Sequence, residues 1–184
     1  MPGVLIVEDQ PAVSRALAIL FEVHDIPCEV VRTPAEAVAR VSSGGVGLVV
    51  QDMNFGPAAT SGEEGIALFR QIRAVDPAMP VMLMTAWTSL ETAVALVREG
   101  ANDYLAKPWD DVKLVASVRT LLSMRALQIE NERLKKGRAE SRAELASRYD
   151  LCGLVYESDA MHRLVSFAVQ VAAADVPVLV TGPN

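Results

Sequence analysis

The sequence lacks any apolar run near the roughly 20 residues that a membrane-spanning helix needs. It also lacks a basic N-terminal region followed by an apolar stretch, so we expect no signal peptide. Its two cysteines, Cys28 and Cys152, lie far apart and match no metal-binding spacing, which is typical of reduced thiols. The net charge of −6 argues against a general nucleic-acid surface. Together these absences predict a cytoplasmic protein with no membrane partner.

Short apolar runs alternate with helical segments along residues 1–122. The runs are Val4–Val7, Cys28–Val31, Leu48–Val50, Val81–Met84 and Tyr104–Leu105. Strands that alternate with helices are typical of a parallel sheet with helices on both faces. We therefore expect one α/β domain with a five-stranded parallel sheet over residues 1–122.

Several helix starts can be predicted from capping residues. Pro11 suits the first position of a helix. Thr33–Glu36 has the pattern of a capping box, in which a hydroxyl and a carboxylate satisfy the first backbone N–H groups of a helix. Ser61–Glu64 and Thr88–Glu91 have the same pattern, and each precedes an apolar-periodic stretch.

Residues 123–149 form a segment of different character, rich in Glu, Arg, Lys, Ala and Leu. This composition predicts a charged helical linker. A seam at 3-4-3 spacing consists of Met124, Leu127, Asn131 and Leu134, with Asn131 as a polar residue at one core position. Polar residues then interrupt the seam. Two interpretations stay open, a helix paired in a short coiled coil and a solvated single helix.

Residues 150–184 change character again. Ser158 and Asp159 can cap a helix that runs to Val171, and Val176–Val180 predicts a strand. This αβ piece is too small to bury its own apolar face. We expect it to be the truncated N-terminal part of a second domain.

Polar side chains follow four of the predicted strands. Glu8 and Asp9 follow the first run, Asp52 the third, Thr85 the fourth and Lys107 the fifth. Because the carboxyl ends of parallel strands meet at one edge of the sheet, these residues are expected to converge there. Three carboxylates repel one another unless a cation joins them, and hard oxygen ligands suit Mg²⁺. The set therefore predicts a magnesium site suited to phosphoryl chemistry, with a carboxylate as nucleophile.

The motifs VLIVED, LVVQDM, LMTAW and ANDYLAKPW occur in this order within residues 1–122. As a set, these motifs resemble the receiver domain of two-component response regulators, which has a flavodoxin-like fold. The resemblance implies that Asp52 accepts a phosphoryl group as an acyl phosphate. It further implies that Glu8, Asp9 and Asp52 hold Mg²⁺ together with the main-chain carbonyl of Asn54.

The same resemblance assigns roles to residues near the fourth and fifth strands. Thr85 and Lys107 would bind the phosphoryl oxygens. Tyr104 lies at the aromatic switch position, where the ring turns inward as the threonine closes on the phosphate. Lys107-Pro108 resembles the cis peptide of the family, which aims the lysine.

The end of the chain, LCGLVYESDAMHRLVSFAVQVAAADVPVLVTGPN, resembles the start of the AAA+ domain of sigma-54-dependent, NtrC-type activators. In that family a glycine-rich phosphate loop follows a similar strand. Gly182 would begin this loop, but the remaining residues, including the lysine, are not in this chain. We therefore expect a signalling switch rather than an enzyme, and a sequence cut from a longer regulator.

These resemblances imply a histidine kinase as partner and a homodimer through the 88–122 face and the linker helix. In the full-length parent they imply sigma-54 RNA polymerase and DNA as partners, although nothing within these residues resembles a helix-turn-helix. One alternative is a phosphorylation-independent receiver that acts only as a dimerisation module. A haloacid-dehalogenase-type phosphatase would need a second Asp where Asn54 stands. A flavodoxin-like cofactor binder would repel a flavin phosphate with its acidic strand ends.

Overall fold

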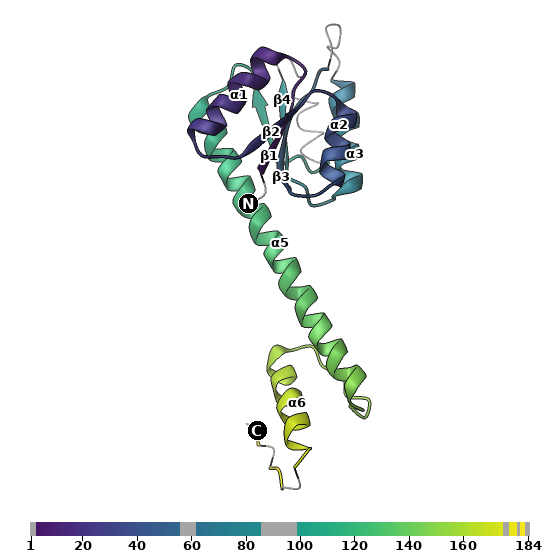
Figure 1. The fold of residues 1–184 in the computed structure, drawn as a ribbon. Coiled ribbons are helices and arrows are strands. Elements are labelled where there is room, and N and C mark those ends of the chain that lie inside the picture. The colour runs from purple at the N-terminus through teal and green to yellow at the C-terminus, as the bar shows by residue number, and fades with distance from the viewer. Residues whose placement is uncertain (1–2, 56–61, 86–98, 175–176, 180, 183–184) are drawn as a thin grey trace. The chain divides into compact units, whose positions relative to one another are not determined.

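The computed structural model describes residues 3–55, 62–85, 99–174, 177–179 and 181–182 (Figure 1). The chain divides into two compact units, Met1–Ile129 and Glu130–Asn184. No helix in the described part of the chain is long and apolar enough to cross a lipid bilayer.

The first unit contains a five-stranded parallel sheet with the strand order β2-β1-β3-β4-β5. Its strands are β1 (Gly3–Val7), β2 (Cys28–Val31), β3 (Val46–Asp52), β4 (Val81–Thr85) and β5 (Asp103–Ala106). This arrangement confirms the predicted fold class. Strand β3 is longer than the predicted Leu48–Val50 and includes Asp52 as its last residue.

Helices cover both faces of the sheet (Figure 1). One apolar layer joins the sheet to α1 (Pro11–Val23) and to the start of α5 (Asp111–Arg148). The other layer joins the sheet to α2 (Pro34–Ser42) and α3 (Glu63–Val75). Successive residues of a strand point to opposite faces, so the centre of the sheet is buried on both sides and reads as a continuous apolar run.

The capping predictions have different outcomes. The capping box at Thr33–Glu36 is confirmed, with both of its hydrogen bonds present at the start of α2. The capping box predicted at Ser61–Glu64 is not tested, because Ser61 lies outside the described residues; the helix itself is present as α3, with Gly62 as its N-cap residue. Gly62 has φ 72°, which glycine adopts readily, and one oxygen of the Glu64 carboxylate accepts from the backbone N–H of Phe55 at 3.2 Å. Thr88–Glu91 lies outside the described residues.

Helix α5 continues through the predicted linker to Arg148. Within the first unit, its Arg125 is 8% exposed and forms an ion pair with Asp76, which follows α3. The pair joins the helix, beyond its apolar contacts with the sheet, to a segment on the other side of the first unit. Arg125 therefore stabilises the position of α5 on the first unit.

Replacement of Arg125 by Ala is expected to lower the free energy of unfolding by about 1–2 kcal/mol, because it removes the ion pair and the buried stem of Arg125, while the partly exposed Asp76 carboxylate keeps its bond from Ala78 N. Arg133 is the matched control, since its ion pair with Glu130 lies on the same helix but is exposed. Urea denaturation should show a clear decrease for R125A and little change for R133A. Equal midpoints for the two variants would contradict a structural role for Arg125.

The second unit consists of the C-terminal part of α5 and of α6 (Asp159–Val171). The predicted cap of α6 is confirmed, because the Ser158 hydroxyl accepts from Met161 N at 3.2 Å. Asp159 pairs with Arg138 and Arg142 of α5, each at 3.1 Å. These ion pairs hold α6 against α5.

The predicted strand Val176–Val180 is not formed over its described residues, 177–179, which are irregular and exposed. The apolar pattern alone is insufficient because a strand needs a neighbouring strand for its backbone hydrogen bonds. Gly182 lies in the same irregular end of the chain, where an added Cβ would meet no other residue within 4 Å.

Candidate functional site

Three carboxylates lie together at the carboxyl edge of the sheet. Glu8 and Asp9 directly follow β1, and Asp52 is the last residue of β3. One oxygen of each carboxylate lies within 4.8 Å of the others. The Glu8 and Asp52 residues are only 1% and 4% exposed, so water screens their charges weakly. The predicted convergence of these residues is confirmed.

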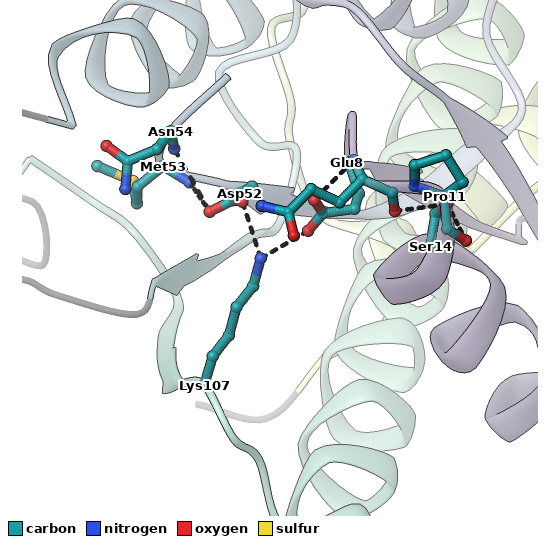
Figure 2. A network of polar contacts seen from close by, with 8 residues as sticks. Glu8, Pro11, Ser14, Asp52, Met53, Asn54 and Lys107 are labelled. Atoms are coloured by element: carbon teal, nitrogen blue, oxygen red, sulfur yellow. Dashed lines mark hydrogen bonds and ion pairs between the residues drawn. The ribbon is translucent and has the colours of Figure 1, made fainter. Parts of the chain in front are cut away.

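Lys107 joins two of these carboxylates (Figure 2). Its Nζ donates to Glu8 Oε2 at 2.6 Å and to Asp52 Oδ2 at 2.8 Å. Lys107 follows β5 directly, and its peptide bond with Pro108 is cis, as the resemblance implied. The ammonium therefore reaches the acidic cluster from the opposite side of β3 to Glu8, as the strand order requires.

Backbone N–H groups hold the remaining carboxylate oxygens (Figure 2). Met53 N donates to Asp52 Oδ1 at 2.7 Å, and Gln10 N donates to Glu8 Oε1 at 3.1 Å. The Ser14 hydroxyl donates to Gln10 O at 3.1 Å and so fixes the first turn of α1 next to Glu8. Sequence reasoning missed these contacts, because a backbone donor has no signature in the sequence.

Burial and charge shift the pKa of both members of the closest ion pair. Burial raises the pKa of the Glu8 carboxyl, and the charge of Asp52 adds to the rise while the Lys107 ammonium opposes it. Burial alone would lower the pKa of Lys107, but its hydrogen bonds to Asp52 and Glu8 outweigh burial and raise it. Lys107 therefore stays charged at neutral pH.

The acidic cluster suits a divalent cation. Three carboxylates and one ammonium sum to a formal charge of −2 when all are ionised. Closely spaced carboxylate oxygens are the hard ligands that Mg²⁺ takes in proteins. The expected main-chain ligand, Asn54, lies two residues beyond Asp52, and its side-chain Oδ1 accepts from Gly62 N at 3.0 Å. The donor set therefore fits Mg²⁺.

Thr85 and Tyr104 lie on β4 and β5, the two strands on the other side of β3 from β1. Thr85 is the last residue of β4 and is 1% exposed, and its carbonyl accepts from Lys107 N at 2.8 Å. This contact puts Thr85 beside Lys107 at the same edge of the sheet. Tyr104 is half-buried and packs against the apolar cluster on the α2 and α3 face. Gly182 belongs to the second unit.

Comparison with known proteins finds a family match over the part of the chain that contains the sheet and the acidic cluster. The family model "Response regulator receiver domain" matches residues 4–119. The C4-dicarboxylate transport transcriptional regulatory protein DctD of Rhizobium meliloti (strain 1021) is 32% identical over 181 residues, 98% of this chain and 37% of that protein. The transcriptional regulatory protein ZraR of Escherichia coli (strain K12) is 38% identical over 121 residues, 66% of this chain and 25% of that protein.

A solved structure has the same fold. The signal receiver domain of a putative Luxo repressor protein from Vibrio parahaemolyticus is 26% identical, with a TM-score of 0.63. The match covers 71% of this chain and 97% of that chain. This chain spans only 37% and 25% of the lengths of the two curated relatives, DctD and ZraR. The similarity to DctD nevertheless extends well beyond residue 119, through the rest of α5 and α6.

Proposed function

The chain belongs to the response regulator receiver domain family, and on that premise we propose that Asp52 accepts a phosphoryl group from a histidine kinase. The observation that carries this proposal is the position of Lys107 Nζ, 2.8 Å from Asp52 Oδ2 and 2.6 Å from Glu8 Oε2. An ammonium in this position is suited to neutralise charge on a transferred phosphoryl group. Asp52 Oδ1 is held separately by Met53 N.

In the proposed reaction, a carboxylate oxygen of Asp52 attacks the phosphorus of a phosphohistidine. The new P–O bond makes Asp52 an acyl phosphate. The P–N bond breaks, and its electron pair returns to the imidazole nitrogen. Lys107 and Thr85 bind the phosphoryl oxygens. Glu8, Asp9, Asp52 and the Asn54 carbonyl would hold Mg²⁺, which would supply further neutralisation of charge on those oxygens. Thr85 and Tyr104 then shift as the switch residues.

The test of this proposal is phosphoryl uptake from a small phosphodonor. The protein is incubated with acetyl phosphate and Mg²⁺, and intact mass spectrometry measures the mass of one added phosphoryl group. We expect uptake that requires Mg²⁺ and is lost on addition of a chelator. Unchanged mass under all conditions would contradict the proposal.

We further propose that this switch controls a sigma-54-dependent transcription activator. The support is the similarity to DctD, a transcriptional regulatory protein, over 98% of this chain. On this proposal residues 1–122 are the receiver, 123–149 the linker and 150–184 the beginning of an AAA+ domain. The longer parent acts in the cytoplasm with sigma-54 RNA polymerase and DNA.

The proposed output of the switch is a change in self-association through the 88–122 face and the linker helix. The seam on α5 supports a pairing role, because Met124, Leu127 and Leu134 are 58%, 72% and 48% exposed. Exposed apolar side chains at coiled-coil spacing are suited to contact a second helix. The same exposure also favours the alternative, a helix that pairs the chains without phosphorylation.

Light scattering distinguishes these two functions. We expect the molar mass of the wild type to change on addition of Mg²⁺ and beryllofluoride, a mimic of the acyl phosphate, and that of D52N to stay constant. L127Q should weaken self-association, whereas I129Q, on another face of the same helix, should not. A molar mass equal to that of a dimer both with and without the mimic would favour the phosphorylation-independent module.

A further inference from the structure

Gln51, the residue directly before Asp52, is a polar side chain in the apolar centre of the sheet. It is 0% exposed, and its Nε2 donates to the main-chain carbonyl of Gly65 at 2.8 Å. Its Oε1 is buried and has no hydrogen-bond partner in the described part of the chain. A buried amide that is only half satisfied lowers stability relative to an apolar residue of the same size. A half-satisfied amide next to the last residue of β3 suggests a role beyond packing.

The contact partner of Gln51 is the first turn of α3, which lies directly against the end of β3. Gly65 N donates to Met53 O at 3.1 Å. A Cβ at Gly65 would lie 2.5 Å from Met53 Cα, so only glycine permits this approach of the two backbones. Gln51 thus bonds to the carbonyl of Gly65, and Met53 bonds to its N–H. These two residues flank Asp52 in the sequence.

The same backbone segment orients the Asp52 carboxylate. Met53 N donates to Asp52 Oδ1 at 2.7 Å, and Asn54 N lies 3.4 Å from the same oxygen. The Asn54 side chain accepts from Gly62 N, and Phe55 N donates to the Glu64 carboxylate. Each residue from 53 to 55 is therefore joined to the start of α3. The position of that helix decides where the Met53 N–H and the Asn54 backbone lie.

We propose that Gln51 is a positioning residue for phosphoryl acceptance. Its amide ties the first turn of α3 to β3, and through this turn it holds the backbone of Met53 and Asn54 in place. That backbone aims the Asp52 carboxylate and brings the Asn54 carbonyl to the cation. The inference rests on the proposed function, since it concerns the same acidic cluster, but it adds a residue on the opposite face of the sheet from Asp52.

The test compares Gln51→Met with Val49→Ala. Met preserves the volume of Gln and removes the donor to Gly65. Val49 is also fully buried, lies two residues earlier on the same face of β3, and loses packing without any polar contact to α3. Calorimetry measures the affinity for Mg²⁺ alone and for beryllofluoride at saturating Mg²⁺, and urea denaturation measures the stability of both variants. Gln51→Asn, with an amide one methylene too short for Gly65, provides a second variant if Gln51→Met does not fold.

We expect Gln51→Met and Gln51→Asn to weaken Mg²⁺ binding about tenfold, as is common when the support of a metal ligand is lost. Val49→Ala should bind Mg²⁺ within about twofold of the wild type even though its cavity lowers stability. Wild-type affinity in Gln51→Met would overturn the positioning role. A loss of Mg²⁺ affinity in proportion to the loss of stability in all variants, Val49→Ala included, would also overturn it. Such a result would show that loss of packing is enough to weaken binding. A wild type that binds neither Mg²⁺ nor beryllofluoride would instead contradict the proposed function itself.

Discussion

Asp52→Asn is expected to reduce phosphoryl uptake from acetyl phosphate to background. The amide lacks the nucleophilic carboxylate oxygen that forms the acyl phosphate. The fold should survive, because an asparagine of the same shape can still accept from Met53 N. Removal of one charge also relieves repulsion between the Asp52 and Glu8 carboxylates, which raises the pKa of Glu8 in the wild type. The asparagine NH2 then replaces Asp52 Oδ2 beside Lys107 Nζ and cannot accept from it, so the two effects oppose each other and we expect the thermal midpoint of D52N without Mg²⁺ to stay close to that of the wild type.

Asp103→Asn is the matched control for this experiment. The Asp103 carboxylate accepts from the N–H of the next residue at 2.8 Å, as that of Asp52 does, but it begins β5 and so lies at the opposite edge of the sheet. D103N should take up phosphoryl groups at the wild-type rate in intact mass spectrometry. Uptake by D52N at that rate would place the acceptor at another residue and contradict the assignment.

The convergence of the site was predictable because it depends only on topology. Alternation of strands and helices requires a parallel sheet, and a parallel sheet brings the ends of its strands to one edge. Glu8, Asp52 and Lys107 each follow or end a strand, so their meeting needed no knowledge of individual side-chain contacts. The cis peptide before Pro108 was implied by resemblance and not by the residues themselves.

Contacts between distant side chains were not predictable in this way. Arg125 and Asp76 are 49 residues apart, and each alone reads as an ordinary surface charge. The Glu64 carboxylate accepts from Phe55 N because the chain after β3 passes beside α3, a contact that the residues around Glu64 do not indicate. Such pairings depend on which backbone segments pass one another, and a local pattern does not contain that information.

The strand at Val176–Val180 was mispredicted for a related reason. Its apolar run matches those of the five strands that do form, yet residues 177–179 are irregular. Strands β1 to β5 each pair with at least one neighbour along most of their length. An apolar run becomes a strand only where such a neighbour exists. The pattern therefore indicates that a segment can form a strand, and the fold of the rest of the domain decides whether it does.

Lys107→Ala is expected to destabilise the protein strongly in the absence of Mg²⁺. The Glu8 and Asp52 side chains are 1% and 5% exposed, and both lose their ammonium partner in this variant. Breaking a buried ion pair by removing one member costs about 3 kcal/mol of unfolding free energy, because the other charge stays buried. Urea denaturation in the presence of a chelator should therefore show a large decrease in K107A. Lys113→Ala, at an exposed position of α5, should change little.

Two further experiments on K107A, addition of Mg²⁺ and a second substitution, distinguish this electrostatic effect from a loss of packing. Mg²⁺ should restore much of the stability of K107A, since a divalent cation among the three carboxylates replaces the missing positive charge. Asp52→Asn in the K107A background should also restore stability, because it removes one of the two carboxylates left without the ammonium. If neither Mg²⁺ nor Asp52→Asn raised the stability of K107A, the repulsion among these carboxylates would be too weak to define a cation site. Phosphoryl uptake by K107A should be lost even where Mg²⁺ restores the fold, since the ammonium is the group that binds the phosphoryl oxygens.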